Sequence, residues 1–450
     1  MLVMKIRNII LLALLFVLPG ISCKKQIDIQ PKGAINPANL GQNEVKQLLT
    51  GVYRSFQNNP SSYSFVLGDL MGENLTNSNL FNSGDLVDFV QGTVKASNNI
   101  VYQMWWGYYN GIFNCNTLLQ TLGKLEPTTT NKQIAATAKY FRAYGYFNLA
   151  IRWGGVPLVT EPTTSLVKRS SLADTWALIK SDLQAAIIDL PPISTISLDP
   201  QYTVSQEAAQ ALMARVALYT GDNATAATLA EGLINNPKFS LETDYSKVYH
   251  TVGNKELIFG FKYLSNETGL VANTNPSFVN TGLYTLFTTN AFPQRGSYVY
   301  LPSQEFQNLF TPGDTRTSTS FTNYNNNGLI MVNKFWNYEP IIISRIAEMY
   351  LISAEAQGLA GINRLNELRQ VRGLAPVVTA NTADYMTAIQ LERRKELFGE
   401  GHRLYDLIRT NTAIGTLKFI TDKNKLLLPV PQQEIDVNND PTNFSQNPGY

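Results

Sequence analysis

Apolar residues recur at a spacing of three and four along much of this chain, which is the pattern of helices with one buried face. Between Asn43 and Gln57 the apolar positions are Val45, Leu48, Leu49, Val52, Tyr53 and Phe56. The same spacing predicts further helices over about 101–120, 131–151, 172–189, 205–219, 223–235, 344–359, 361–371 and 384–398. We therefore expect a mostly α fold.

The segment from Ser205 to Asn235 predicts two helices that pack closely. Its sequence AAQALMARVALYTGDNATAATLAEGLI carries small residues where the helices must approach, and Gly221, Asp222 and Asn223 supply a turn and a helix cap. This pair resembles a tetratricopeptide repeat, in which helix pairs stack into a curved scaffold. The other predicted pairs match that repeat more loosely.

Two regions between the predicted helices have a different composition. Residues 58–100 and about 260–340 are rich in Asn, Ser, Thr, Gly and aromatic residues. They are too long to be simple connections, and long ordered loops in a compact domain usually carry function. We expect these loops to form the face that binds a ligand.

The amino terminus predicts export. Lys5 and Arg7 precede an unbroken apolar run over residues 9–18, which is too short to span a bilayer but suits a signal peptide. Cys23 follows small residues and resembles the lipidated cysteine of bacterial lipoproteins, although Gly20 stands where that pattern usually has Leu. We expect a signal peptide over 1–22 and a lipid-anchored tether over 23–41. The alternative is an ordinary secretory signal with an incidental cysteine.

Composition and charge exclude several classes of function. The 450 residues are 44% hydrophobic and carry a net charge of +2, which falls close to zero without Lys5 and Arg7, so nothing favours a nucleic-acid partner. With Cys23 lipidated, Cys115 has no disulfide partner and is expected to be a buried, inert thiol. His250 and His402 are isolated, and the sequence predicts neither a metal site nor a cofactor.

The segment ERRKELFGEGHRLYDLIR, from Glu392 to Arg409, places nine charged side chains in eighteen positions. Glu392 and Glu396 lie one helical turn apart with basic neighbours, which predicts mutual ion pairing. Two carboxylates could also be the acid and base of a glycosidase, but that chemistry needs groups that face each other and one raised pKa. Carboxylates among arginines should have lowered pKa values. We interpret the segment as structural.

The same segment resembles a late helical motif of the SusD-like (RagB/SusD) outer-membrane lipoproteins. FRAYGYFNLAIRWGGVPLVTEP, ISRIAEMYLISAEA, LNELRQVRGL, MWWGYYNGIFNCNTLL and LLLPVPQQEIDVNNDPTNFSQNPGY resemble other parts of that family in its order. The residues that match the charged motif are Glu392, Arg393, Glu396, Leu397, Glu400, Gly401, Arg403, Asp406, Leu407 and Arg409.

The resemblance implies a non-catalytic receptor subunit. Such proteins are lipid-anchored, surface-exposed outer-membrane proteins with a tetratricopeptide-type scaffold, and they deliver oligosaccharides to a TonB-dependent transporter of the SusC type. Residues 42–450 would form one SusD-like domain, with the helical scaffold at about 42–57, 101–235 and 341–410. The segment CKKQID is less acidic than many surface-sorting signals. On this interpretation the charged motif packs late helices together.

Sugars bind to flat aromatic rings and to amide or carboxylate groups on a largely preformed surface. Trp105 matches an early tryptophan of the family and is expected in the core, so its helical neighbour Trp106 should point elsewhere and is a candidate platform. The further candidates are Phe65, Asn79, Phe81, Asp85, Tyr284, Arg295, Tyr298, Tyr300, Trp336 and Tyr338. Two alternatives stay open, a peptide-capturing import lid of the RagB type and a surface glycoside hydrolase.

Overall fold

The computed structural model describes residues 40–58, 60, 63–77, 84–262, 300–324, 329–335 and 340–450. Residues 41–450 form one compact unit. The predicted signal peptide and Cys23 lie outside the described residues. The helices are α2 (Val45–Asn58), α3 (Tyr63–Met71), α4 (Gly84–Gln91), α5 (Asn99–Leu122), α6 (Thr129–Trp153), α7 (Leu172–Asp189), α8 (Gln206–Tyr219), α9 (Asn223–Ile234), α10 (Lys247–His250), α12 (Gln304–Gln307), α13 (Thr317–Ser320), α14 (Ile346–Ala356), α15 (Ile362–Val371), α16 (Thr382–Glu396), α17 (Arg403–Arg409), α18 (Ala413–Thr416) and α19 (Gln432–Asn438).

The strands of the described residues are short and form three antiparallel pairs. They are β1 (Leu75–Asn77), β2 (Leu257–Phe261), β3 (Tyr300–Pro302), β4 (Phe321–Tyr324), β5 (Leu329–Val332) and β6 (Ile341–Arg345). In the described part of the chain β1 pairs with β3, β2 with β6 and β4 with β5. Leu75 lies opposite Pro302, and Phe261 lies opposite Ile341. The prediction of a mostly helical fold is confirmed.

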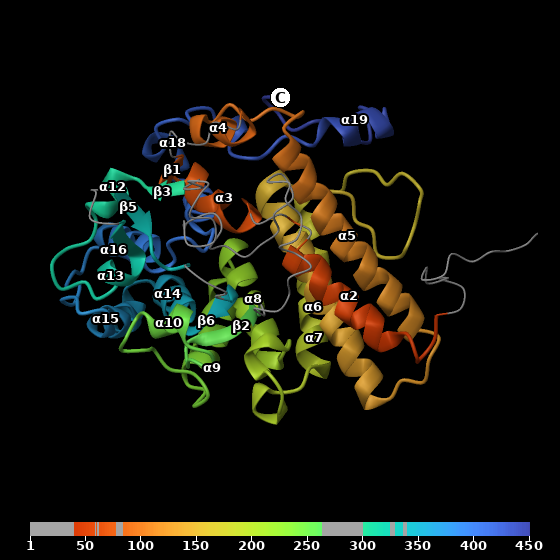
Figure 1. Ribbon diagram of the computed structural model, residues 1–450, viewed down its shortest axis with the longest axis horizontal. Coiled ribbons are helices and arrows are strands. Elements are labelled where there is room, and N and C mark those ends of the chain that lie inside the picture. Colours follow the sequence, from red (N-terminus) through yellow and green to blue (C-terminus); the bar gives the residue numbers. More distant parts are fainter. Residues whose placement is uncertain are drawn as a thin grey trace, which may run out of the picture. The chain divides into compact units, whose positions relative to one another are not determined.

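The scaffold is a succession of packed helices. Each of α5 to α9 packs against the next, and α14 packs against α9 (Figure 1). The predicted pair at 205–235 is confirmed as α8 and α9. Gly221 has a φ of +75°, and the side chain of Asp222 accepts a hydrogen bond from the Thr225 amide, so the turn and cap form as the sequence predicts.

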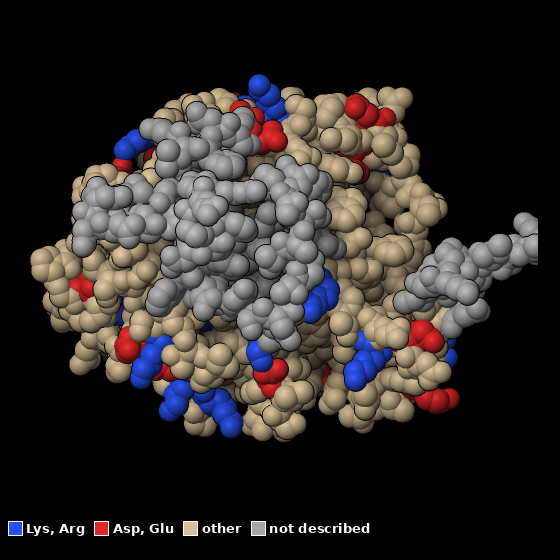
Figure 2. Space-filling view, viewed as in Figure 1, with Lys and Arg blue, Asp and Glu red and all other residues tan. Residues whose placement is uncertain are grey.

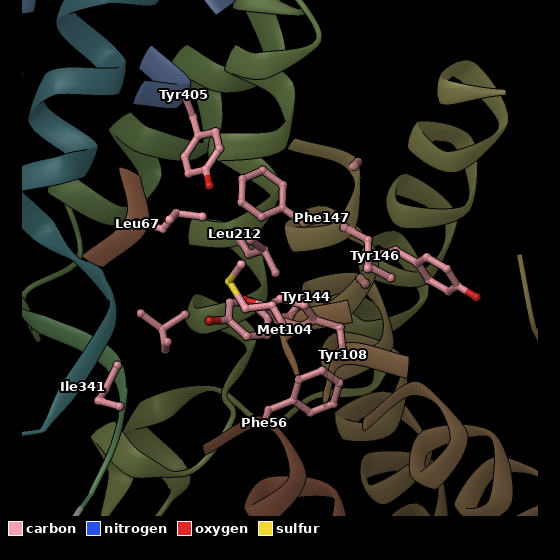
Figure 3. Close-up of a cluster of buried hydrophobic side chains, with 14 of the residues drawn as sticks. Phe56, Leu67, Met104, Tyr108, Tyr144, Tyr146, Phe147, Leu212, Ile341 and Tyr405 are labelled. Atoms are coloured by element: carbon pink, nitrogen blue, oxygen red, sulfur yellow. The ribbon is translucent and has the colours of Figure 1, made fainter. Parts of the chain in front are cut away.

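Glycines let α2 pack tightly against α5 and α6. A Cβ on Gly111 would lie 2.6 Å from the ring of Phe56, and one on Gly145 would lie 3.0 Å from the same ring. Phe56 therefore fills space that two side chains would otherwise occupy. Figure 3 shows this ring at one end of the buried cluster, below Tyr108 and Met104.

One expectation about secondary structure is wrong, since the region 58–100 is not only loop: α3, β1 and α4 lie within it. The helix expected over about 344–359 is present as α14, and it begins at Ile346 because Ser344 and Arg345 belong to β6. The helix α3 has seven buried residues out of nine, so it lacks the one-sided apolar spacing by which an amphipathic helix is recognised.

None of the described helices combines the length and the apolar character that crossing a bilayer requires.

Candidate functional site

The charged segment spans the end of α16, a turn and α17, and most of its charged side chains are buried. Glu392, Glu396, Arg393, Lys395 and Asp406 are each at least 97% buried. Charged groups at this depth are very costly unless they are paired and hydrogen-bonded. Their partners therefore decide what the segment can do.

Glu396 is the centre of this network. Its carboxylate accepts hydrogen bonds from Arg316 at 2.9 Å, Arg345 at 2.7 Å and Arg372 at 2.8 Å. Arg316 directly precedes α13, Arg345 ends β6 and Arg372 directly follows α15. One carboxylate on α16 thus joins three elements that are distant in the sequence.

The predicted ion pairing of Glu392 and Glu396 with their basic neighbours on α16 is wrong. Glu392 pairs with Arg316 and Arg369, each at 2.6 Å, and Arg393 pairs with Asp406 of α17 at 2.9 Å. The basic side chains of α16 point to carboxylates on other elements, as Lys395 does to Asp314. Pairing across elements gives the buried Glu392, Arg393, Lys395 and Glu396 counter-ions that neighbours on α16 do not provide.

The carboxylates are held in their charged form. Burial alone would raise the pKa of Glu396, but Arg372, Arg345 and Arg316 lower it well below its usual value. Burial also opposes ionisation of Glu400, whose pKa is nevertheless lowered to about 2, chiefly by Arg345 and Lys334. A general acid needs a raised pKa, so this network is suited to joining elements and not to donating protons.

Two other buried groups have pKa values near neutrality. Burial raises the pKa of Asp69 to about 6, against hydrogen bonds from Asn74 and from the Gly401 amide, and burial lowers the pKa of Lys334 to about 8. Asp69 lies on α3 and its carboxylate accepts from the Gly401 amide at 2.8 Å. It therefore connects α3 to the turn between α16 and α17.

Asp69 gives a prediction about pH. Its folded-state pKa is raised above the unfolded value of 3.8, so the stability that protonated Asp69 contributes is fully present below about pH 4 and is lost as the pH rises through about 6. The free energy of unfolding of the wild type, relative to Asp69→Asn, should therefore fall between pH 4 and pH 7. Denaturation curves at several pH values measure this difference. Asp222→Asn, at an exposed position, is the control: hydrogen bonds from Thr225 lower the pKa of Asp222, so its contribution is lost only below about pH 4 and should not fall between pH 4 and pH 7.

Seven ligand-contact candidates lie outside the described residues, and four lie within them. Those outside are Asn79, Phe81, Tyr284, Arg295, Tyr298, Trp336 and Tyr338. Those within are Phe65 on α3, Asp85 on α4, Tyr300 on β3 and Trp106 on α5. The first three come together, because α3 packs against α4 and β1, and β1 pairs with β3. Trp106 lies on a different element.

Trp106 and its neighbour Trp105 have opposite environments, as expected. Trp105 is 2% exposed and packs edge-to-face on Trp153 with ring centroids 5.3 Å apart, whereas Trp106 is 48% exposed. Phe113, two turns further along α5 and on the same side, is also 48% exposed. The sequence reasoning missed Phe113, although its seven-residue separation from Trp106 is the signal that places both rings on one face.

Helix α5 suits an uncharged ligand, because its sequence contains no Asp, Glu, Lys or Arg. Figure 2 shows acidic side chains at the upper right and basic and acidic ones at the lower right, with uncharged surface between them. The two rings lie about 10 Å apart along the helix axis, from a rise of about 1.5 Å per residue. A chain of sugar rings could span that distance, whereas one sugar ring could not.

The remaining described candidates are less accessible. Tyr300 is fully buried and packs edge-to-face against Tyr63 at 6.4 Å, which argues for a packing role. Phe65 is partly buried and packs against the core. Asp85, in the first turn of α4, is also partly buried.

Other possible sites are less suited to a sugar or to chemistry. A groove of about 480 Å³ lies beside α15 and has no aromatic ring among its lining residues, which are Asn363, Asn366, Glu367, Gln370, Leu374 and Pro376. The described chain contains no group of three or more His, Cys, Asp or Glu side chains that could hold a metal ion. Cys115 is buried, and burial raises the pKa of its thiol, so it is not a nucleophile at neutral pH.

Comparisons with known proteins identify the family. A family model described as "Starch-binding associating with outer membrane" matches residues 27–218, and the model of the SusD family matches residues 286–450. "SusD-like protein P38" of Formosa agariphila is 26% identical, over 92% of this chain and 93% of that protein. "SusD-like protein P25" of the same organism is 24% identical, over 97% of both.

Solved structures share the fold. A "Laminarin binding SusD-like protein" superposes with a TM-score of 0.77 at 24% identity, over 91% of this chain and 100% of that one. "Surface glycan-binding protein A" from Bacteroides thetaiotaomicron, in complex with laminarihexaose, superposes with a TM-score of 0.76 at 19% identity, over 88% and 98%. The two family models cover most of the chain in the order that the motifs indicate, and the chain belongs to the SusD/RagB family, which is associated with the outer membrane.

Proposed function

We propose that this protein captures oligosaccharides at the cell surface and delivers them to a SusC-like TonB-dependent transporter. The SusD family consists of non-catalytic glycan-binding proteins. Relatives of the same fold include a laminarin-binding protein and one solved with laminarihexaose, which supports a glycan ligand for this chain. A lipid on Cys23 would hold the protein at the outer membrane.

The exposed aromatic pair on α5 is the observation that carries the proposal. A tryptophan that is half exposed on a rigid helix offers a flat apolar ring without any cost of ordering a loop. Phe113 supplies a second ring on the same face. Aromatic rings of this kind bind the C–H faces of sugars, and the loop residues that lie outside the described part would add hydroxyl contacts.

The experiment that tests this function is a calorimetric screen of the purified protein against glycans and peptides. Laminarin and laminarihexaose come first, followed by plant, fungal, bacterial and host glycans, and product analysis is done on the same mixtures. Binding of a glycan without cleavage supports the proposal. Binding of peptides alone would favour the import lid of the RagB type, and cleavage of a glycan would contradict a receptor without catalytic activity.

Trp106→Ala should weaken glycan binding roughly three- to tenfold, because an aromatic contact is worth about 0.5–1.5 kcal/mol. The melting temperature should stay unchanged, since half of this side chain is already exposed to solvent. Phe419→Ala is the matched control, because Phe419 is 54% exposed but lies in the segment after α18. If the wild type and Trp106→Ala bound every glycan with equal affinity, α5 would not be part of the binding surface.

A further inference from the structure

Arg152 on α6 is a buried cation without a carboxylate partner among the described residues. Its Nη1 donates to the carbonyl and the side-chain oxygen of Asn148, at 3.1 and 2.7 Å, and its Nη2 donates to the Ser64 carbonyl at 2.6 Å. Neighbouring buried arginines differ, because Arg142 pairs with Asp182 at 2.7 Å and Arg215 pairs with Glu348 at 2.6 Å.

Aromatic rings offset only part of the free-energy cost of burying this charge. The guanidinium of Arg152 lies 5.1 Å from the ring centroid of Tyr405 and 5.6 Å from that of Tyr108. Cation–π contacts contribute less free energy than it costs to bury an unpaired charge. A counter-charge beside Arg152 would therefore stabilise the fold.

A small, partly open cavity borders Arg152. Its volume is about 50 Å³, and its lining includes Ser64, Asn148, Arg152, His402 and Tyr405. Arg152 and Tyr405 both belong to this lining, and Arg152 Nε and the Tyr405 hydroxyl are buried without a well-aligned hydrogen bond to another group, although the hydroxyl lies close to the Arg152 guanidinium. Figure 3 shows the hydroxyl of Tyr405 pointing inward between Leu67 and Phe147.

The size of the cavity limits its occupant. A single water molecule needs roughly 10–15 Å³ of such space, so the cavity can hold a few waters or one small ion. Water would satisfy the two donors but would leave the charge of Arg152 uncompensated.

The other charged groups that line the cavity are already balanced. Arg215 pairs with Glu348, and Glu400 accepts from Arg345 at 2.9 Å and lies 3.4 Å from the Lys334 ammonium. His402 is neutral at physiological pH, because burial lowers its pKa to about 4. The remaining charge of the lining is that of Arg152, which is positive.

We infer that this cavity binds a small monovalent anion of about the size of chloride, which accepts hydrogen bonds from Arg152 Nε and the Tyr405 hydroxyl. The anion joins α6 to α17, and the same arginine already binds the Ser64 carbonyl of α3. It would act as a fixed counter-ion at the junction of the early helices with the charged motif. This role is independent of the glycan-binding function.

The test uses crystals of the protein soaked in bromide, which scatters anomalously and can replace chloride. An anomalous peak should lie within hydrogen-bond distance of Arg152 Nε and Tyr405 Oη, and Tyr405→Phe should lose it. In solution, the melting temperature in chloride should exceed that in gluconate at the same ionic strength by about 1–2 °C, because a ligand that binds only the folded state stabilises it.

Tyr140→Phe is the matched control variant. The hydroxyl of Tyr140 is also buried without a partner, but it does not line the cavity. This variant should keep both the bromide peak and the chloride effect. A cavity with water but no anomalous peak would overturn the inference. A peak together with equal melting temperatures in the two salts would mean binding at crystal concentration only and would overturn it as well.

Discussion

Replacing Glu396 with glutamine should lower the free energy of unfolding by about 3–5 kcal/mol, the amount typical of removing one partner from a buried ion pair. The amide has the size of the carboxylate, so the change creates no cavity. It leaves Arg316, Arg345 and Arg372 with one counter-charge fewer in a region that water does not reach. Chemical denaturation of both proteins measures the difference.

Glu367→Gln is the matched control for this experiment. Glu367 also forms an ion pair with an arginine, Arg364, at 2.7 Å, but its side chain is 47% exposed. An exposed pair contributes at most about 1 kcal/mol. Equal effects of the two substitutions would contradict the interpretation that burial makes the Glu396 network a structural joint.

The helical part of this fold follows from the sequence because its signals are local. The three-and-four spacing placed α5 to α9 within a few residues of their observed ends, and Asp222 caps α9 as its position predicts. The different environments of Trp105 and Trp106 also follow from local geometry, since adjacent residues on a helix point in different directions.

The charged network could not be predicted in detail, because its pairs are far apart in the sequence. Glu396 bonds to arginines that are 80, 51 and 24 positions away. Spacing along one helix can indicate only pairs at three or four positions, and in this network one such pair forms, between Asp406 and Arg409 of α17 at 2.8 Å. The sequence thus predicted that Glu396 would carry a negative charge, but not which arginines lower its pKa.

The ligand face is even less determined by sequence patterns. An aromatic residue in a loop can serve packing or binding, and the burial of Tyr300 decides between these roles only once the strands β1 and β3 are paired. On α5 the helical repeat does identify a face, and Phe113 could have been found with Trp106 on that basis. Where regular structure holds a residue, its direction follows from the sequence.

Gly68→Ala should also destabilise the protein strongly, by about 2–3 kcal/mol, although alanine is the better helix former. The helix α3 approaches the turn after α16 backbone to backbone, and a Cβ on Gly68 would lie 2.1 Å from the carbonyl oxygen of Gly401. Gly401 itself has a φ of +79°, and its own Cβ would lie 2.6 Å from the Phe65 carbonyl oxygen. Neither α3 nor this turn can move without disturbing the hydrogen bond that the Gly401 amide donates to the Asp69 carboxylate.

Gly51→Ala, also in a helix, should have the opposite effect on stability. Gly51 lies inside α2, and a Cβ there would meet no atom within 4 Å, so the substitution should stabilise the protein by up to about 1 kcal/mol. The sign of the change in free energy of unfolding therefore distinguishes close backbone packing from helix propensity. If Gly68→Ala stabilised the protein as Gly51→Ala should, α3 would not lie against the turn of the charged motif, and the proposed role of that motif in joining the early and late helices would fail.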